Sequence, residues 1–177
     1  LPPLPDGDIL LHCGDATIRS SYVEIQQFAQ WFDSQPYKHK LFVPGNHDWM
    51  LNSIVGQSMT PTLFKNSKVL LNNLIEVEGL SIYGVAQDHD FQSIPSDLDI
   101  LITHYPPNGI LDEIPPHTKF NNTPWSENIG SNILLKKVLE VKPRYHFFGH
   151  VHECSGEVKR YKDTLFIKKV TCLIVYY

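Results

Sequence analysis

The stretch LFVPGNHD at residues 41–48 joins an apolar run to three chemically active side chains. Its first three residues predict a strand, and Gly45 allows a sharp turn where that strand ends. In the turn, Asn46 offers an amide oxygen that can bind a cation, His47 can transfer a proton near neutral pH, and Asp48 can hold the imidazole in one orientation. The same residue types also form ordinary capping turns. The strands elsewhere in the chain decide between a site and a turn.

Three further apolar runs, at residues 8–13, 99–103 and 145–148, end in the same way. Together with Asn46, the residues that follow these runs and can bind a cation are Asp15, His104, His150 and His152. In open α/β sheets, ligands bind beyond the carboxyl ends of the strands. The sequence therefore predicts a metal site at that edge of the sheet.

Apolar residues recur at helical spacing from 21 to 32, with Ser20 or Ser21 available as the N-cap. This helix lies between the strands predicted at 8–13 and 41–43. A strand, a helix and a strand in this order form a βαβ unit, so we expect the two strands to be parallel neighbours.

Three short strand-like runs follow, at residues 68–71, 74–77 and 80–85. Asn72-Asn73 and Gly79 separate them and are hairpin signals, so we expect a meander that feeds a mixed sheet. The other predicted elements are a helix capped by Ser131 and a strand at 164–167, whereas residues 51–67 fit no clear pattern.

The candidate ligands favour a transition metal over calcium. Mixed nitrogen and oxygen ligation suits Mn, Fe, Zn or Co, whereas Ca prefers oxygen alone. His150 and His152 are two residues apart and project to the same side if they continue the strand. Asp15 can bridge two divalent ions through its two oxygens. Two adjacent ions polarise a phosphoryl oxygen and lower the pKa of a bridging water, which is the chemistry of phosphoester hydrolysis.

Four ordered blocks resemble the calcineurin-like metallophosphoesterase superfamily: Gly14-Asp15, Gly45-Asn46-His47-Asp48, Thr103-His104-Tyr105-Pro106-Pro107 and Gly149-His150-Val151-His152. The flanking sequence is most similar to its small eukaryotic metallophosphoesterase-domain branch, whose members act on phosphodiesters including cyclic nucleotides. The resemblance extends to about Ile167. It implies one domain over residues 1–177, an α/β fold in a four-layer α/β/β/α sandwich, and hydrolysis of a small phosphorylated substrate by a metal-activated hydroxide.

The resemblance also implies residue roles. Asp15 resembles the ligand that bridges two metals, and the residues that resemble the remaining ligands of one metal are Asn46, His104 and His150. His152 resembles a ligand of the other metal. His47 resembles the catalytic histidine that stabilises the phosphoryl charge or protonates the leaving oxygen, and Asp48 resembles its orienting partner. Two divalent ions, Mn, Fe or Zn, are the implied cofactors.

The sequence departs from the superfamily pattern at both ends. The first Asp-x-His block and the strand before it are expected upstream of Leu1, so the chain is expected to be truncated there and one metal site to be incomplete. After Ile167 the sequence is atypical and closes on an apolar, strand-like run at 170–177, expected as an open edge. A non-catalytic scaffold of the same fold and an inactive fragment are the alternatives to an active enzyme.

Composition narrows the function classes. The net charge of -4 and the absence of a basic stripe argue against a nucleic-acid groove. No apolar run reaches the roughly 18 residues that span a bilayer, and three widely spaced cysteines suit a reducing compartment. We therefore expect a cytoplasmic protein with a small phosphoester substrate, and the sequence leaves its oligomeric state open. The histidines expected to be structural or exposed are His12, His39, His89, His117 and His146.

Overall fold

The computed structural model describes residues 4–86, 90–114, 128–153, 155–168 and 172–175, the last range as backbone only. The described strands are β1 (Ile9–His12), β2 (His39–Phe42), β3 (Lys68–Val69), β4 (Asn73–Val77), β5 (Leu80–Val85), β6 (Ile100–Thr103), β7 (Tyr145–Phe148), β8 (Val158–Tyr161), β9 (Thr164–Lys168) and β10 (Cys172–Val175). The described helices are α1 (Tyr22–Asp33), α2 (Ile54–Leu63) and α3 (Asn132–Val141), with 3-10 helices η1 (Asn46–Asn52) and η2 (Phe91–Ser93).

The strands form two mixed sheets. In the four-stranded sheet the order is β10-β1-β2-β3, with β1, β2 and β3 parallel and β10 antiparallel to β1. In the six-stranded sheet the order is β4-β5-β6-β7-β9-β8, parallel in its centre and antiparallel at both edges. The parallel β1–α1–β2 unit predicted from the sequence is confirmed.

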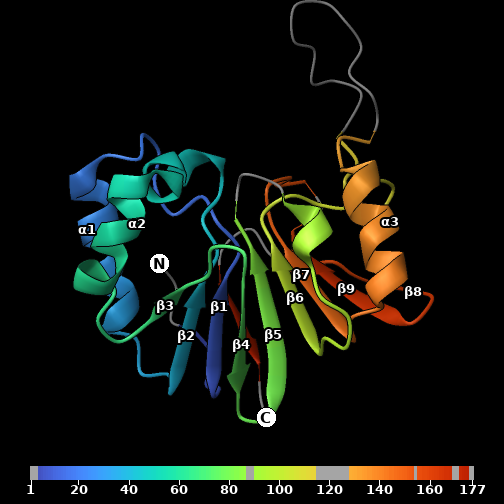
Figure 1. Cartoon of the computed structure of the whole chain (residues 1–177), viewed down its shortest axis with the longest axis horizontal. Helices are drawn as coiled ribbons and strands as arrows, with labels where there is room; N and C mark the ends of the chain where they lie inside the picture. Colours follow the sequence, from blue (N-terminus) through green and yellow to red (C-terminus); the bar gives the residue numbers. More distant parts are fainter. Residues whose placement is uncertain (1–3, 87–89, 115–127, 154, 169–171, 176–177) are drawn as a thin grey trace, which may run out of the picture.

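The two sheets face each other, and helices cover their outer faces (Figure 1). Between the sheets, β1 and β2 contribute Leu11 and Leu41 to a buried cluster that also holds Ile82 and Ile102 from β5 and β6. On the outer side of the four-stranded sheet, α1 packs Phe32 and its neighbours against the next residues of the same strands. Because side chains alternate across a strand, each strand feeds two cores.

Local sequence signals explain where α1 and α3 begin. The Ser21 hydroxyl accepts a hydrogen bond from the Glu24 amide, and the Glu24 carboxylate accepts one from the Ser21 amide, which completes a capping box. Ser131 caps α3 in the same way through the Leu134 amide. Among the described residues, no helix is both long and apolar enough to cross a bilayer.

One of the topology expectations is wrong. The hairpin predicted at Asn72-Asn73 does not form, because β3 pairs with β2 in one sheet and β4 pairs with β5 in the other. Asn72 has a positive φ of 58°, and its side-chain oxygen accepts a hydrogen bond from the Ala86 amide, so the chain crosses between the sheets here. The hairpin at Gly79 is confirmed.

The edge of the four-stranded sheet was also a subject of the sequence predictions. The apolar run near the end of the chain forms β10, which pairs antiparallel with β1 from Ile9 opposite Val175 to His12 opposite Cys172. Strand β10 is the edge strand of the described sheet, as expected for this run, and it pairs with one side of β1. Strand β8 and the helices η1 and α2 were not predicted.

Candidate metal centre

Two glycines bring the loops after β1 and β2 into direct contact. A Cβ atom on Gly14 would lie 2.7 Å from the Gly45 Cα and 2.4 Å from His104 Nδ1, and one on Gly45 would lie 2.3 Å from Asp15 Oδ1. All three distances are far below an ordinary van der Waals contact, so each position excludes any larger residue. Gly14 also has a φ of +99°, which favours glycine. The two loops can therefore meet only because both lack side chains at this point.

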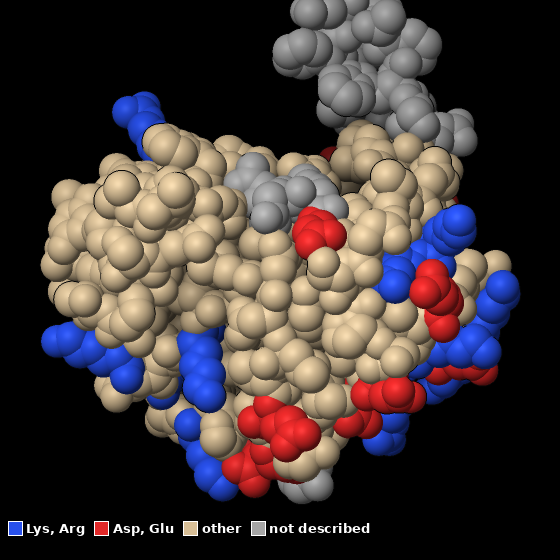
Figure 2. Space-filling view, viewed as in Figure 1, with Lys and Arg blue, Asp and Glu red and all other residues tan. Residues whose placement is uncertain are grey.

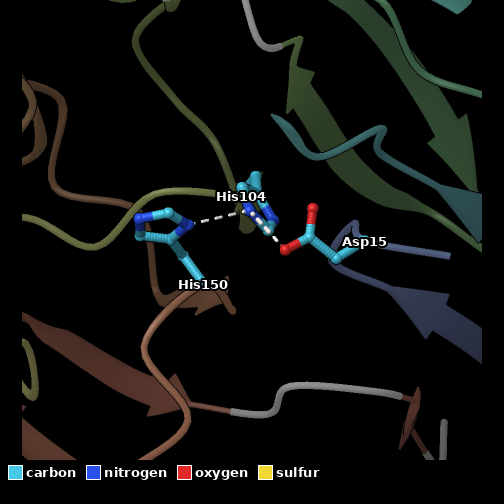
Figure 3. Close-up of side chains that lie close together, drawn as sticks. All are labelled: Asp15, His104 and His150. Carbon is cyan, nitrogen blue, oxygen red and sulfur yellow. Dashed lines mark hydrogen bonds and ion pairs between the residues drawn. The ribbon is translucent and has the colours of Figure 1, made fainter. Parts of the chain in front are cut away.

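Four side chains converge beyond the carboxyl ends of β1, β2, β6 and β7. His104 Nε2 lies 3.3 Å from Asp15 Oδ2, 2.9 Å from Asn46 Oδ1 and 3.1 Å from His150 Nδ1. His150 Nδ1 also lies 3.0 Å from Asn46 Oδ1. Figure 3 shows His104 between Asp15 and His150, with contacts to both. We call Asp15, Asn46, His104 and His150 the metal cluster.

The hydrogen bond on the other side of His104 determines what its ring offers to the cluster. His104 Nδ1 lies 2.7 Å from the Cys13 carbonyl oxygen, which can only accept, so Nδ1 carries the proton. In the neutral ring, Nε2 then presents a lone pair toward the oxygens of Asp15 and Asn46. If His150 Nδ1 carries a proton, that proton can form a hydrogen bond with only some of the neighbouring acceptor atoms. Acceptor atoms this close repel one another unless a cation lies among them, so the residues fit a divalent metal ion.

The pKa values favour the metal-binding protonation states. Burial pushes the pKa of the Asp15 carboxyl up, but the interaction with the His104 imidazole, together with the hydrogen bond from the His47 amide, lowers it overall. Burial, aided by the charge of His104, lowers the pKa of His150 to about 4. Near neutral pH, Asp15 is therefore ionised and His150 neutral, as metal ligands must be.

His150 reaches the cluster through an irregular loop. Its φ of 68° lies in the left-handed region, which a non-glycine residue rarely adopts. The Gly149 amide donates to the His104 carbonyl at 3.0 Å, which ties the loop after β7 to the end of β6. The Tyr105 ring lies against His150, with 4.3 Å between the ring centres. The loop is thus held from two sides.

His47 lies beside the cluster and is exposed to solvent. Its amide donates to Asp15 Oδ1 at 3.0 Å, and its Nδ1 donates to the Ile18 carbonyl at 2.9 Å. Nε2 is therefore the ring nitrogen left for other contacts. The hydrogen bond to Ile18 is the largest cause of a raised pKa at His47, because the charged imidazole donates more strongly.

The Asp48 carboxylate does not occupy the position expected for an orienting partner of His47. It is fully buried and accepts hydrogen bonds from the amides of Ala16, Thr17 and Gly45 and from the Thr17 hydroxyl, at 2.9–3.2 Å. Burial raises the pKa of the Asp48 carboxyl despite these donors. Asp48 therefore joins the loop after β1 to the loop after β2, and the imidazole of His47 donates its hydrogen bond to the Ile18 carbonyl instead.

The structure places four other histidines outside the metal cluster. His152 is exposed and lies outside the group of close metal-binding atoms found among the described residues. His12 is buried against Phe28 and Phe42, and His146 is buried with Nε2 on the Thr103 hydroxyl. His39 contacts Glu78. His89 and His117 lie outside the described residues.

Three contributors to the site were missed by the sequence analysis. The Cys13 carbonyl sets the tautomer of His104, Thr17 anchors Asp48, and Tyr105 packs on His150. A backbone carbonyl carries no sequence signal, so the role of the Cys13 carbonyl could not be predicted from the sequence. For Tyr105, the available sequence signal was its position directly after the candidate ligand His104.

Comparison with known proteins agrees with this geometry. A family model described as calcineurin-like phosphoesterase matches residues 1–154. A UPF0046 protein of Caenorhabditis elegans is 32% identical over 204 residues, covering 97% of this chain and 70% of that protein. Human metallophosphoesterase domain-containing protein 1 is 30% identical over 212 residues, covering 98% of this chain and 62% of that protein. The chain thus spans less than two thirds of the human relative.

A solved structure shares the fold at much lower identity. The phosphopantetheinyl hydrolase of Mycobacterium tuberculosis superposes with a TM-score of 0.60 at 13% identity, covering 96% of this chain and 82% of that one. At this identity the likeness shows the fold alone.

Proposed function

This chain belongs to the calcineurin-like phosphoesterase family, and on that premise we propose that it is a metal-dependent phosphodiesterase acting on a small substrate such as a cyclic nucleotide. The observation that carries the proposal is the convergence of four potential ligand atoms, from Asp15, Asn46, His104 and His150, at the carboxyl ends of four strands. The layered arrangement of helices and sheets supports the four-layer α/β/β/α sandwich of metal-dependent phosphatases.

In this proposal the metal cluster holds one divalent ion, with Mn, Fe or Zn suited to its mixed nitrogen and oxygen donors. When bound, such an ion polarises a phosphoryl oxygen and lowers the pKa of a water molecule. The Cys13 carbonyl keeps the His104 proton on Nδ1, so that Nε2 stays available. Asp15 Oδ1 is held by the His47 amide, which fixes the direction of its other oxygen.

His47 is proposed to act on the phosphoryl group. Its Nδ1 is engaged by Ile18, so Nε2 is the atom that can face a substrate. The raised pKa increases the protonated fraction near neutral pH, where an imidazolium can stabilise phosphoryl charge or protonate the leaving oxygen. His152 is proposed to contribute, with Asp15, to a second site that is incomplete in this chain. We therefore propose one tightly held ion per chain.

Turnover of a generic aryl phosphodiester by the purified chain in the presence of Mn²⁺ tests the proposal. His47→Ala should reduce the rate by about 10²-fold or more, the usual effect of losing a general acid, while metal content is unchanged. His39→Ala removes an imidazole at the far end of β2 and should leave the rate unchanged.

Elemental analysis separates the remaining outcomes. One bound metal with no turnover of any aryl phosphoester would favour the non-catalytic scaffold. Two equally occupied sites would contradict the incomplete second site. A chain that binds no metal would remove the basis of the proposal.

A further inference from the structure

A cavity lies at the end of the four-stranded sheet opposite the metal cluster. Its walls come from residues 38–41, where β2 begins, and from residues 65–68, which lead into β3, with Val77 contributed by the other sheet. Because β2 and β3 are parallel, these walls lie at the amino ends of both strands, whereas the metal cluster follows the carboxyl ends. The cavity has a volume of about 270 Å³.

The cavity is strongly basic. Four lysines line it, namely Lys38, Lys40, Lys65 and Lys68. They are four of only 15 lysines and arginines in a chain with a net charge of -4, so the local charge is opposite to that of the whole chain. Figure 2 shows basic side chains at the lower left, in the region of β2 and β3, with acidic side chains near the bottom of the same face.

Two of these lysines already have partners. Lys40 is buried, and its Nζ donates to the carbonyls of Gln35 and Tyr37 at 3.2 and 3.1 Å, close to the end of α1. Lys38 Nζ lies 2.6 Å from the Glu78 carboxylate. These two lysines therefore shape the cavity and contribute positive potential, but their donors are largely occupied.

The other two lysines are available. Lys65 and Lys68 are exposed, and neither forms an ion pair with any residue that the structure describes. The backbone beneath them is nevertheless fixed, because Asp33 accepts hydrogen bonds from the amides of Lys65 and Asn66 and from the Ser67 hydroxyl. The Asp33 carboxylate is thereby occupied by the segment itself. Lys65 and Lys68 thus both line the cavity from a backbone segment that Asp33 holds in place.

We propose that this cavity is an anion-binding site for a small phosphate compound, with Lys65 and Lys68 as its principal ligands. Lysine binds phosphate as a point charge through charge-assisted hydrogen bonds. The volume lies just below the usual range of about 300–1,000 Å³ for ligand pockets, which favours a compact anion such as pyrophosphate over a nucleotide. The site lies away from the metal cluster and does not depend on the proposed hydrolase activity.

Calorimetric titration of the full chain with pyrophosphate tests this site. The protein is first stripped of metal and then dialysed free of chelator, so that no bound metal attracts the probe. We expect one binding event per chain. Lys65→Glu with Lys68→Glu should weaken it by about tenfold or more, because both principal charges are reversed.

The matched control is Lys136→Glu with Arg160→Glu, which changes the net charge equally at exposed positions on α3 and β8. This variant should bind pyrophosphate as the wild type does. If both variants lose affinity equally, the binding is a general effect of charge and the proposal is wrong. It is also wrong if the wild type shows no binding at millimolar pyrophosphate. Should the charge-reversed variant fail to fold, Lys65→Gln with Lys68→Gln replaces it, with the same expected direction.

Discussion

Replacing Gly45 with alanine should disrupt the metal cluster without any change in its ligands. Gly45 has φ −95° and ψ −173°, which alanine adopts freely, so backbone strain is excluded as a cause. The added Cβ would lie 2.3 Å from Asp15 Oδ1, 2.5 Å from the Asp15 amide nitrogen and 2.7 Å from His104 Cε1. These atoms belong to two of the candidate ligands, and one of the three is a backbone atom.

The size of the effect follows from these distances. An ordinary contact needs at least 3.4 Å, so Asp15 or the loop after β2 must move by about 1 Å. Metal sites tolerate deviations of only about 0.2 Å in ligand distance, so we expect Mn²⁺ affinity to fall by about tenfold to 100-fold. Overpacking of a tight contact costs about 1–3 kcal/mol, and for a chain of this length each kcal/mol lowers Tm by about 2–4 °C.

The matched control is Gly109→Ala. Gly109 has a φ of +73° and open space where a Cβ would lie, so this variant suffers backbone strain of about 1–2 kcal/mol without touching the cluster. Both variants should therefore lose stability, but Gly45→Ala alone should lose Mn²⁺ affinity in calorimetric titration. If Gly45→Ala binds Mn²⁺ as tightly as the wild type, the two loops do not depend on their glycine contact and the reasoning is refuted.

Three other predictions concern metal removal, pH and helix capping. Excess chelator should lower the Tm of the Mn²⁺-loaded wild type, because a ligand at 100 times its Kd adds about 2.7 kcal/mol to the free energy of unfolding. His104→Gln should abolish this effect of the chelator in a thermal scan. Burial lowers the pKa of His146 to about 3, so the unfolded chain takes up a proton below the ordinary value of 6.5 while the folded chain does not. The free energy of unfolding should therefore fall on acidification from pH 6.5 toward 3. In urea unfolding, His146→Leu should reduce the slope of this free energy against pH by up to about 1.4 kcal/mol per pH unit. An unchanged slope would contradict the neutral, buried state of His146. Ser21→Ala should cost about 1 kcal/mol through loss of the capping box, and equal urea midpoints would contradict that role.

Features set by neighbouring residues could be predicted from the sequence. The caps at Ser21 and Ser131 and the hairpin at Gly79 depend on contacts within a few positions, and all three are confirmed. The strand ends could also be located, since they follow from short apolar runs. The structure accordingly brings Asp15, Asn46, His104 and His150 together, while their roles as metal ligands stay a prediction.

Features that depend on contacts between residues far apart in the sequence could not be predicted. Asn72-Asn73 has the local character of a hairpin, but the chain there changes sheets, because Leu70 packs against Gly84 and Val43 in the core between them. Asp48 follows His47 directly, yet its carboxylate turns toward donors more than 30 residues away. Their adjacent positions in the sequence suggested that Asp48 pairs with the His47 imidazole. Instead, the Asp48 carboxylate is buried and pairs with backbone amides.

The metal cluster takes two residues from each sheet: Asp15 and Asn46 follow strands of the four-stranded sheet, and His104 and His150 follow strands of the six-stranded one. An ion held by all four would act as a cross-link between the two halves of the molecule. Its affinity would then report how well the sheets dock, since binding to a preformed cluster and closing the sheets share one free energy. Substitutions deep in the core, at Ile82 for example, would change the apparent affinity for metal without touching a ligand. In this sense the whole interface between the sheets belongs to the site.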